Sequence, residues 1–190
     1  MPNRSSLTLQ IALLIVTVLY PCAAFANVGE LFLYEKGGGH VGLEHYGRSF
    51  ATRLRAENHF NNHREELAAV AVKLTPPLSV KSIQLDFHLN NNTRNGKHSS
   101  SPLIKLEYTS AKDTKLRYST IEGKNTAIDI PKVIGTDAIV HRFAVIAAPD
   151  QSEDSYADFN LVYLRVNREL VHVIRPNVRL RDDDFLVEHE

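Results

Sequence analysis

Five residues near the start of the chain carry side chains that bind transition metals. Imidazole nitrogens suit zinc, copper and nickel, and a carboxylate can complete such a site. HVGLEH (40–45) is one residue longer than the zinc motif H-x-x-E-H, and HFNNH (59–63) has phenylalanine where H-E-x-x-H has its general base. We therefore predict a metal-binding site, without protease chemistry, if the two groups converge in the fold. Its ligands would be His40, Glu44, His45, His59 and His63.

A second candidate site is the acidic stretch DQSEDSYAD, 150–158, in which oxygen-bearing side chains recur at nearly every second position. This spacing is similar to the first part of an EF-hand loop, where calcium collects six to eight oxygen ligands. The turn glycine of that loop is replaced by Ser155, and its last glutamate by Leu161. The stretch therefore predicts a calcium site of another kind, at Asp150, Asp154 and Asp158, with a solvated acidic connector as the alternative.

The glycine-rich stretch GGGHVGLEHYG, 37–47, lies beside the first candidate site. It matches neither of the glycine patterns that bind phosphate at the start of a helix. We interpret it as a flexible turn that connects a first strand, 30–36, to the rest of the domain.

The elements that must position these residues are mostly strands. Short runs rich in valine, isoleucine, leucine and aromatic residues are bounded by proline, glycine, asparagine and aspartate. Residues 80–89 alternate polar and apolar, as a half-buried strand does. One weak helical stripe lies within 48–66. The strands predicted beyond it are 67–74, 80–89, 103–111, 115–121, 127–134, 138–148, 161–166 and 170–174.

This spacing of strands predicts an all-β fold, a single antiparallel β-sandwich of jelly-roll type with eight or nine strands. We expect residues 27–66, a strand plus an irregular Gly/His-rich segment, to form one domain with the sandwich body at 67–190. Recognition in such folds often lies on loops held by a rigid scaffold. The candidate loops are 37–47, 90–102 and 150–158.

The first 26 residues predict a secretory signal peptide. Arg4 precedes an apolar run, and small residues at Ala24 and Ala26 favour cleavage before Asn27. Cleavage would remove Cys22, the only cysteine, and with it any disulfide or cysteine-based zinc site. We expect an exported protein, periplasmic or secreted, with no transmembrane segment after cleavage.

Charge excludes one class of partner. The chain has 22 basic and 22 acidic residues, so it lacks the basic surface that neutralises nucleic-acid phosphates. We predict no nucleic-acid binding.

The run AVAVKLTPPLSVKSIQLDFHLNNNT, 69–93, resembles secreted bacterial jelly-roll accessory and carbohydrate-binding modules. In these modules a strand ending in Thr-Pro-Pro is followed by an alternating strand and a polar loop. The resemblance implies a jelly-roll fold and a carbohydrate ligand. The tryptophan that often forms the ligand platform of such modules is absent from this chain.

We therefore expect a non-enzymatic binding or interaction module whose ligand is a carbohydrate or a protein partner. One alternative is a histidine-based metal-binding protein or a β-sandwich hydrolase. Another is a structural or assembly protein of the cell envelope. The tyrosines available to stack on a ligand are Tyr34, Tyr46, Tyr108, Tyr118, Tyr156 and Tyr163.

Overall fold

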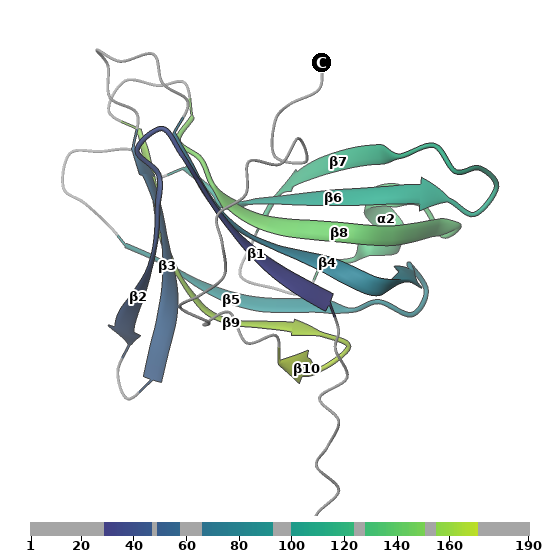
Figure 1. Cartoon of the computed structure of the whole chain (residues 1–190), viewed down its shortest axis with the longest axis horizontal. Coiled ribbons are helices and arrows are strands. Elements are labelled where there is room, and N and C mark those ends of the chain that lie inside the picture. Colours follow the sequence, from purple (N-terminus) through teal and green to yellow (C-terminus); the bar gives the residue numbers. More distant parts are fainter. Residues whose placement is uncertain are drawn as a thin grey trace, which may run out of the picture.

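Two antiparallel sheets packed against each other form the fold (Figure 1), which confirms the predicted all-β sandwich. The computed structural model describes residues 29–46, 49–57, 66–92, 100–123, 128–150 and 155–170. The elements in chain order are β1 (Gly29–Lys36), β2 (His40–Tyr46), β3 (Ser49–Glu57), β4 (Leu67–Ser79), β5 (Leu85–Asn91), β6 (Leu103–Ser110), β7 (Arg117–Glu122), α2 (Ile130–Ile134), β8 (Ala138–Ala147), β9 (Tyr156–Val166) and β10 (Glu169–Leu170).

The chain passes repeatedly from one sheet to the other. Sheet A has the strand order β1-β4-β8-β6-β7. Sheet B has the order β2-β3-β9-β5, and the short β10 pairs with β9 beyond the end of β3. Strands β1, β4 and β5 are each followed by a strand of the opposite sheet. The finer jelly-roll assignment stays a prediction.

The core lies between the sheets and is filled by every second residue of the facing strands. Val70 and Phe143 of sheet A meet Leu54 and Phe159 of sheet B, and all four are at most 1% exposed. The alternation predicted for 80–89 is confirmed where it becomes β5, since Leu85, Phe87 and Leu89 are buried. Burying a side chain of this size stabilises a fold by about 1.5–3 kcal/mol.

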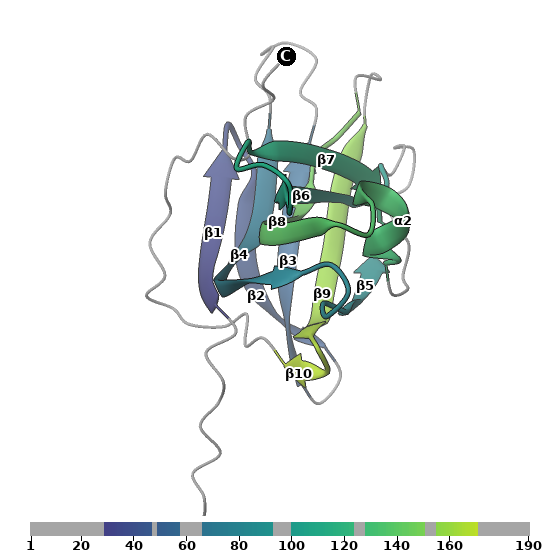
Figure 2. The same ribbon diagram turned by 90° about the vertical axis from the view of Figure 1, so that its right-hand side faces the viewer.

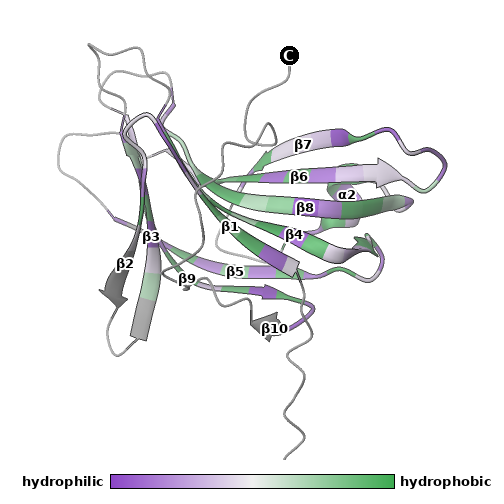
Figure 3. Cartoon of the chain, viewed as in Figure 1, coloured by the Kyte–Doolittle hydropathy of each residue, from purple (hydrophilic) through white to green (hydrophobic). Residues whose placement is uncertain are grey.

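Strand β8 is apolar on both faces towards its end, a sequence pattern typical of a central strand. It pairs with β4 on one side and β6 on the other. Val145 belongs to the main core, whereas Ala144 and Ile146 belong to a second buried cluster, with Tyr34, on the outer face of sheet A. Green and purple stretches alternate along several strands in Figure 3, as this division between faces requires.

Residues 49–57, which were predicted to be irregular or helical, form strand β3. The helical stripe predicted within 48–66 is therefore wrong over this range. The pattern that decides the structure has period two: Leu54 and Ala56 face the core, and arginines alternate with them on the other face. The irregular segment expected within 27–66 therefore contributes both β2 and β3 to sheet B.

The strand predicted at 127–134 is also wrong, because residues 130–134 form the short helix α2. Asp129 accepts a hydrogen bond from the Lys132 backbone N–H, and Pro131 occupies the first turn, where proline is tolerated. Gly135, at φ 88°, ends the helix. The helix lies at the margin of the sandwich (Figure 2) and buries Ile130 in the core.

The three glycines at 37–39 form a turn, as predicted, and this turn carries the chain from sheet A to sheet B. Gly37 has φ 69°, a left-handed conformation that glycine adopts without strain. A Cβ on Gly39 would lie 2.1 Å from the backbone oxygen of Leu67. The second half of the predicted connector, 40–46, is strand β2.

The strands predicted at 161–166 and 170–174 pair as a hairpin in their described part. Strands β9 and β10 are joined by Asn167 and Arg168, which both have positive φ, as a type I′ turn requires. Asn167 also ties the hairpin to the start of β5, because its side-chain oxygen accepts from the Gln84 N–H at 2.8 Å. Strand β9 begins earlier than predicted, at Tyr156.

The hydroxyl of Thr52 is buried in sheet B without a hydrogen-bond partner among the described residues. Because an unpaired buried hydroxyl costs about 1–3 kcal/mol, we expect Thr52→Val, which keeps the shape, to raise the free energy of unfolding by about 1 kcal/mol in urea denaturation. The matched control is Thr109→Val, since the Thr109 hydroxyl pairs with His141 Nε2 at 2.9 Å. The control should lower stability, and equal losses in both variants would contradict the expectation.

Candidate functional site

The outer face of sheet B is polar. On β3, Arg53 and Arg55 alternate with core residues, and on β9 Asp158 and Asn160 do the same. The register pairs Arg53 with Asn160 and Arg55 with Asp158, so these four residues occupy neighbouring positions on one face. Planar, hydrogen-bonding side chains are thus concentrated on the face turned away from the core.

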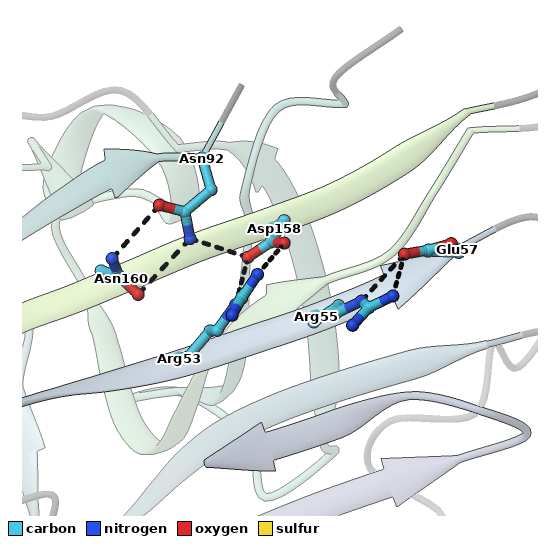
Figure 4. A network of polar contacts seen from close by, with 6 residues as sticks. All are labelled: Arg53, Arg55, Glu57, Asn92, Asp158 and Asn160. Carbon is cyan, nitrogen blue, oxygen red and sulfur yellow. Dashed lines mark hydrogen bonds and ion pairs between the residues drawn. The ribbon is translucent and has the colours of Figure 1, made fainter. Parts of the chain in front are cut away.

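An ion pair between Arg53 and Asp158 is the centre of this face (Figure 4). Arg53 Nε donates to Asp158 Oδ1 at 2.8 Å, and a terminal guanidinium nitrogen donates to Oδ2 at 2.6 Å. The Asp158 side chain is fully buried, while 24% of the Arg53 side chain is exposed. This bidentate geometry holds both groups in fixed orientations.

Two asparagines extend the pair towards β5. The Asn92 amide nitrogen donates to Asp158 Oδ1 at 2.8 Å, and the Asn160 amide nitrogen donates to the Asn92 oxygen at 3.2 Å. Asn92 follows β5, so the network joins side chains from β3, β9 and the end of β5. Each group restricts its neighbours, and the result is a rigid polar network in which Asp158 and Asn160 are buried and Arg53 and Asn92 are partly exposed.

A second arginine of this face also has a carboxylate partner. Arg55 forms an ion pair with Glu57, two residues further along β3, and its Nε donates to Glu57 Oε1 at 2.8 Å. The charges at 53, 55, 57 and 158 are therefore compensated within the face.

An aromatic group lies further along the same face, where β5 and β9 pair. The rings of His88 and Tyr163 are stacked, with centroids 5.9 Å apart and an interplanar angle of 19°. The Arg165 guanidinium carbon lies 4.7 Å from the Tyr163 ring centroid, within the range of a cation–π contact. Tyr163 is half-buried and Arg165 is exposed.

The predicted transition-metal ligands are only partly within the described residues. His40 begins β2, and its Nδ1 lies 3.3 Å from a Glu35 oxygen, with 65% of the His40 side chain exposed. Glu44 and His45 lie on β2, but their side chains are outside the described part, as are His59 and His63 altogether. Among the side chains that the structure describes, no three His, Cys, Asp or Glu residues gather as metal ligands. The transition-metal site stays a prediction.

The predicted calcium ligands do not share one loop. Asp158 lies inside β9, and both of its oxygens accept hydrogen bonds from Arg53. Asp150 is exposed, and its backbone N–H donates to Ser100 Oγ at 2.8 Å. Asp154 falls outside the described residues. The expected loop 150–158 is shorter than predicted, because the strand begins at Tyr156; calcium binding stays a prediction.

Sequence reasoning missed Arg53 and Asn160 as members of a site. The available signal was the alternation of arginine with leucine in R-L-R, 53–55, and of polar with apolar residues in D-F-N, 158–160. The predicted loop 90–102 did contain Asn92, and Tyr163 was among the candidate stacking residues.

The protein is thus an all-β sandwich with a rigid polar network on the outer face of sheet B and an aromatic group, His88 and Tyr163, beside that network. No model of a known protein family matches the chain, and no curated protein does either. In the portion the structure describes, no helix combines the length and apolar character that crossing a bilayer requires.

Proposed function

We propose that the protein is a non-enzymatic binding module that holds a carbohydrate on the outer face of sheet B. The observation that carries this proposal is the hydrogen-bonded network of Arg53, Asp158, Asn92 and Asn160. Its amide and guanidinium groups are planar and fixed before any ligand arrives. A preorganised surface loses little conformational freedom on binding, which favours affinity.

A sugar is the ligand class whose chemistry matches this face. Neighbouring hydroxyl groups donate and accept hydrogen bonds together, as does the partly exposed amide of Asn92. The central charges are already paired with each other, so Arg53 and Asn92 offer hydrogen bonds to a ligand without a strong net field. Beside it, the half-buried Tyr163 forms an aromatic group with His88 and Arg165, and aromatic rings pair an apolar body with a polar tip at binding surfaces.

The resemblance of residues 69–93 to carbohydrate-binding modules supports the same ligand class. Residues 1–26, which lie outside the described residues, support export to the periplasm or cell exterior. A carbohydrate of the envelope or the surroundings would be accessible to a protein in that location. We therefore include export in the proposal.

Tyr163→Ala tests the proposal. We expect the variant to bind its polysaccharide about tenfold more weakly, a loss of about 1.4 kcal/mol, because the aromatic contact is removed. Affinity electrophoresis against a panel of soluble polysaccharides measures the change.

Tyr118→Ala is the matched control, because Tyr118 also lies beside a cation, with Lys105 Nζ 5.6 Å from its ring, but on the outer face of sheet A. It should leave binding unchanged. Equal losses in the two variants would move the site away from sheet B. If no polysaccharide retards the protein and a protein partner binds it instead, the carbohydrate proposal is overturned.

A further inference from the structure

Arg165 differs from the other two arginines of the sheet B outer face. Arg53 and Arg55 are paired with carboxylates. Within the described residues, Arg165 has no carboxylate partner; its contact is with the face of the Tyr163 ring. It is also exposed, so its charge is available to an approaching ligand.

The nearest carboxylate in the strand register does not compensate this charge. Asp86 of β5 lies directly opposite Arg165 of β9. No ion pair or hydrogen bond joins the two side chains in the described structure. The guanidinium instead lies over Tyr163, whose other close ring neighbour is His88. The aromatic contact therefore restricts the guanidinium while leaving its N–H donors unpaired with any carboxylate among the described residues.

An oriented guanidinium is suited to a carboxylate ligand. Its N–H groups form a planar fork that matches the two oxygens of a carboxylate, and stacking on an aromatic ring leaves the edge of that fork open. Hydroxyl groups accept weaker hydrogen bonds from the same donors, because a hydroxyl oxygen carries no formal charge. The position thus favours a ligand that carries negative charge at one end.

We infer that the carbohydrate bound by this protein is an acidic oligosaccharide, whose carboxylate is held by Arg165 beside Tyr163. This inference rests on the proposed carbohydrate-binding function. Arg165 is five positions beyond Asn160 on β9, which corresponds to about 16 Å at about 3.3 Å per residue. A ligand that reaches from Asn92, the partly exposed amide bonded to Asn160, to Arg165 is therefore an oligomer, with its hydroxyl groups at Asn92 and a uronic-acid carboxylate at the aromatic end.

The test compares carboxylated polymers with their neutral counterparts. Polygalacturonate, alginate and hyaluronate are each paired with the same polymer after chemical reduction of its carboxyl groups. Affinity electrophoresis at low salt measures binding of the full mature chain. We expect at least one carboxylated polymer to bind about tenfold more tightly than its reduced form, and the difference to shrink at high salt because charges are screened.

Arg165→Gln should abolish this preference, lowering binding of the carboxylated polymer to the level of its reduced form. Arg165→Lys should restore only part of it, since an ammonium lacks the planar fork. Asp86→Asn should strengthen binding of the carboxylated polymer, because it removes the one carboxylate opposite Arg165. Arg168→Gln, in the adjacent β9–β10 turn, is the matched control and should keep the preference.

Three results would overturn the inference, in two distinguishable ways. Equal binding of carboxylated and reduced polymers by the wild type, or an unchanged preference in Arg165→Gln, would overturn the acidic ligand and leave the carbohydrate function standing. Binding of neither form by the wild type would overturn the carbohydrate function and the inference together. Because Arg165 is exposed, the unfolding temperature of Arg165→Gln should equal that of the wild type. This result would exclude misfolding as the cause of a lost preference.

Discussion

Replacing Asp158 with alanine is expected to lower the free energy of unfolding by about 3 kcal/mol. The substitution leaves the Arg53 guanidinium without its carboxylate in a half-buried position, and it removes the acceptor of the Asn92 amide. Breaking a buried pair by removing one partner costs about 3–5 kcal/mol, and partial exposure of Arg53 places the effect near the lower end. Urea denaturation of the purified mature chain measures it.

Asp113→Ala is the matched control for this prediction. Asp113 also accepts from an arginine, Arg117, at 2.7 Å, but both side chains are largely open to water. The Arg117 hydrogen bond lowers the pKa of Asp113, yet exposed pairs contribute little because solvent screens them. We expect this control to change stability only slightly. A similar small change for Asp158→Ala would show that the network on sheet B contributes little to the fold.

The double variant Arg53→Ala with Asp158→Ala separates the ion pair from the rest of the network. If the cost of the single change comes mainly from an unpaired guanidinium, the double variant should be more stable than the sum of the two single losses predicts. Strictly additive losses would contradict a direct coupling between the two side chains.

Gly39→Ala is the second substitution expected to have a large effect. Its Cβ would lie 2.1 Å from the Leu67 oxygen and 2.4 Å from the Leu67 carbonyl carbon. Both atoms are backbone at the start of β4, so no change of rotamer relieves the overlap. The turn between β1 and β2 must shift, and we expect a loss of about 3 kcal/mol in the free energy of unfolding.

Gly42→Ala is the control for the glycine prediction. Its Cβ would approach only the His40 imidazole, at 2.9 Å. That side chain is 65% exposed and can rotate away. The temperature of thermal unfolding should therefore fall sharply for Gly39→Ala and only slightly for Gly42→Ala. Equal effects would indicate that neither position tolerates a side chain, and that the close approach to Leu67 is not the cause.

The glycine-rich stretch, 37–47, shows which features can be predicted from a short segment of sequence. Counting its spacing excluded the zinc and phosphate motifs that it imitates, and the turn at 37–39 is confirmed. The requirement at Gly39 depends on Leu67, which approaches from a different strand. The assignment of 40–46 to a strand likewise depends on pairing with β3, whose own pattern was misread as a helical stripe.

The candidate site likewise depends on contacts between strands that are distant in the sequence. Sequence reasoning selected histidines and aspartates by their spacing, which reports on chemistry within one short segment. The network that the structure contains joins Arg53 to Asp158, 105 positions apart, and Asn92 to Asn160, 68 positions apart. No spacing rule connects residues at such separations.

The sequence by itself determined the all-β class, the central position of β8 and the inward face of β5, because burial on one side of a strand requires a local period of two. The tertiary structure alone decided which polar residues meet. The register between β3 and β9 places Arg53 beside Asp158, and pairing of β5 with β9 places His88 beside Tyr163. Register is a relation between distant segments, so the chemistry of the outer face of sheet B arises only when the sheet has formed.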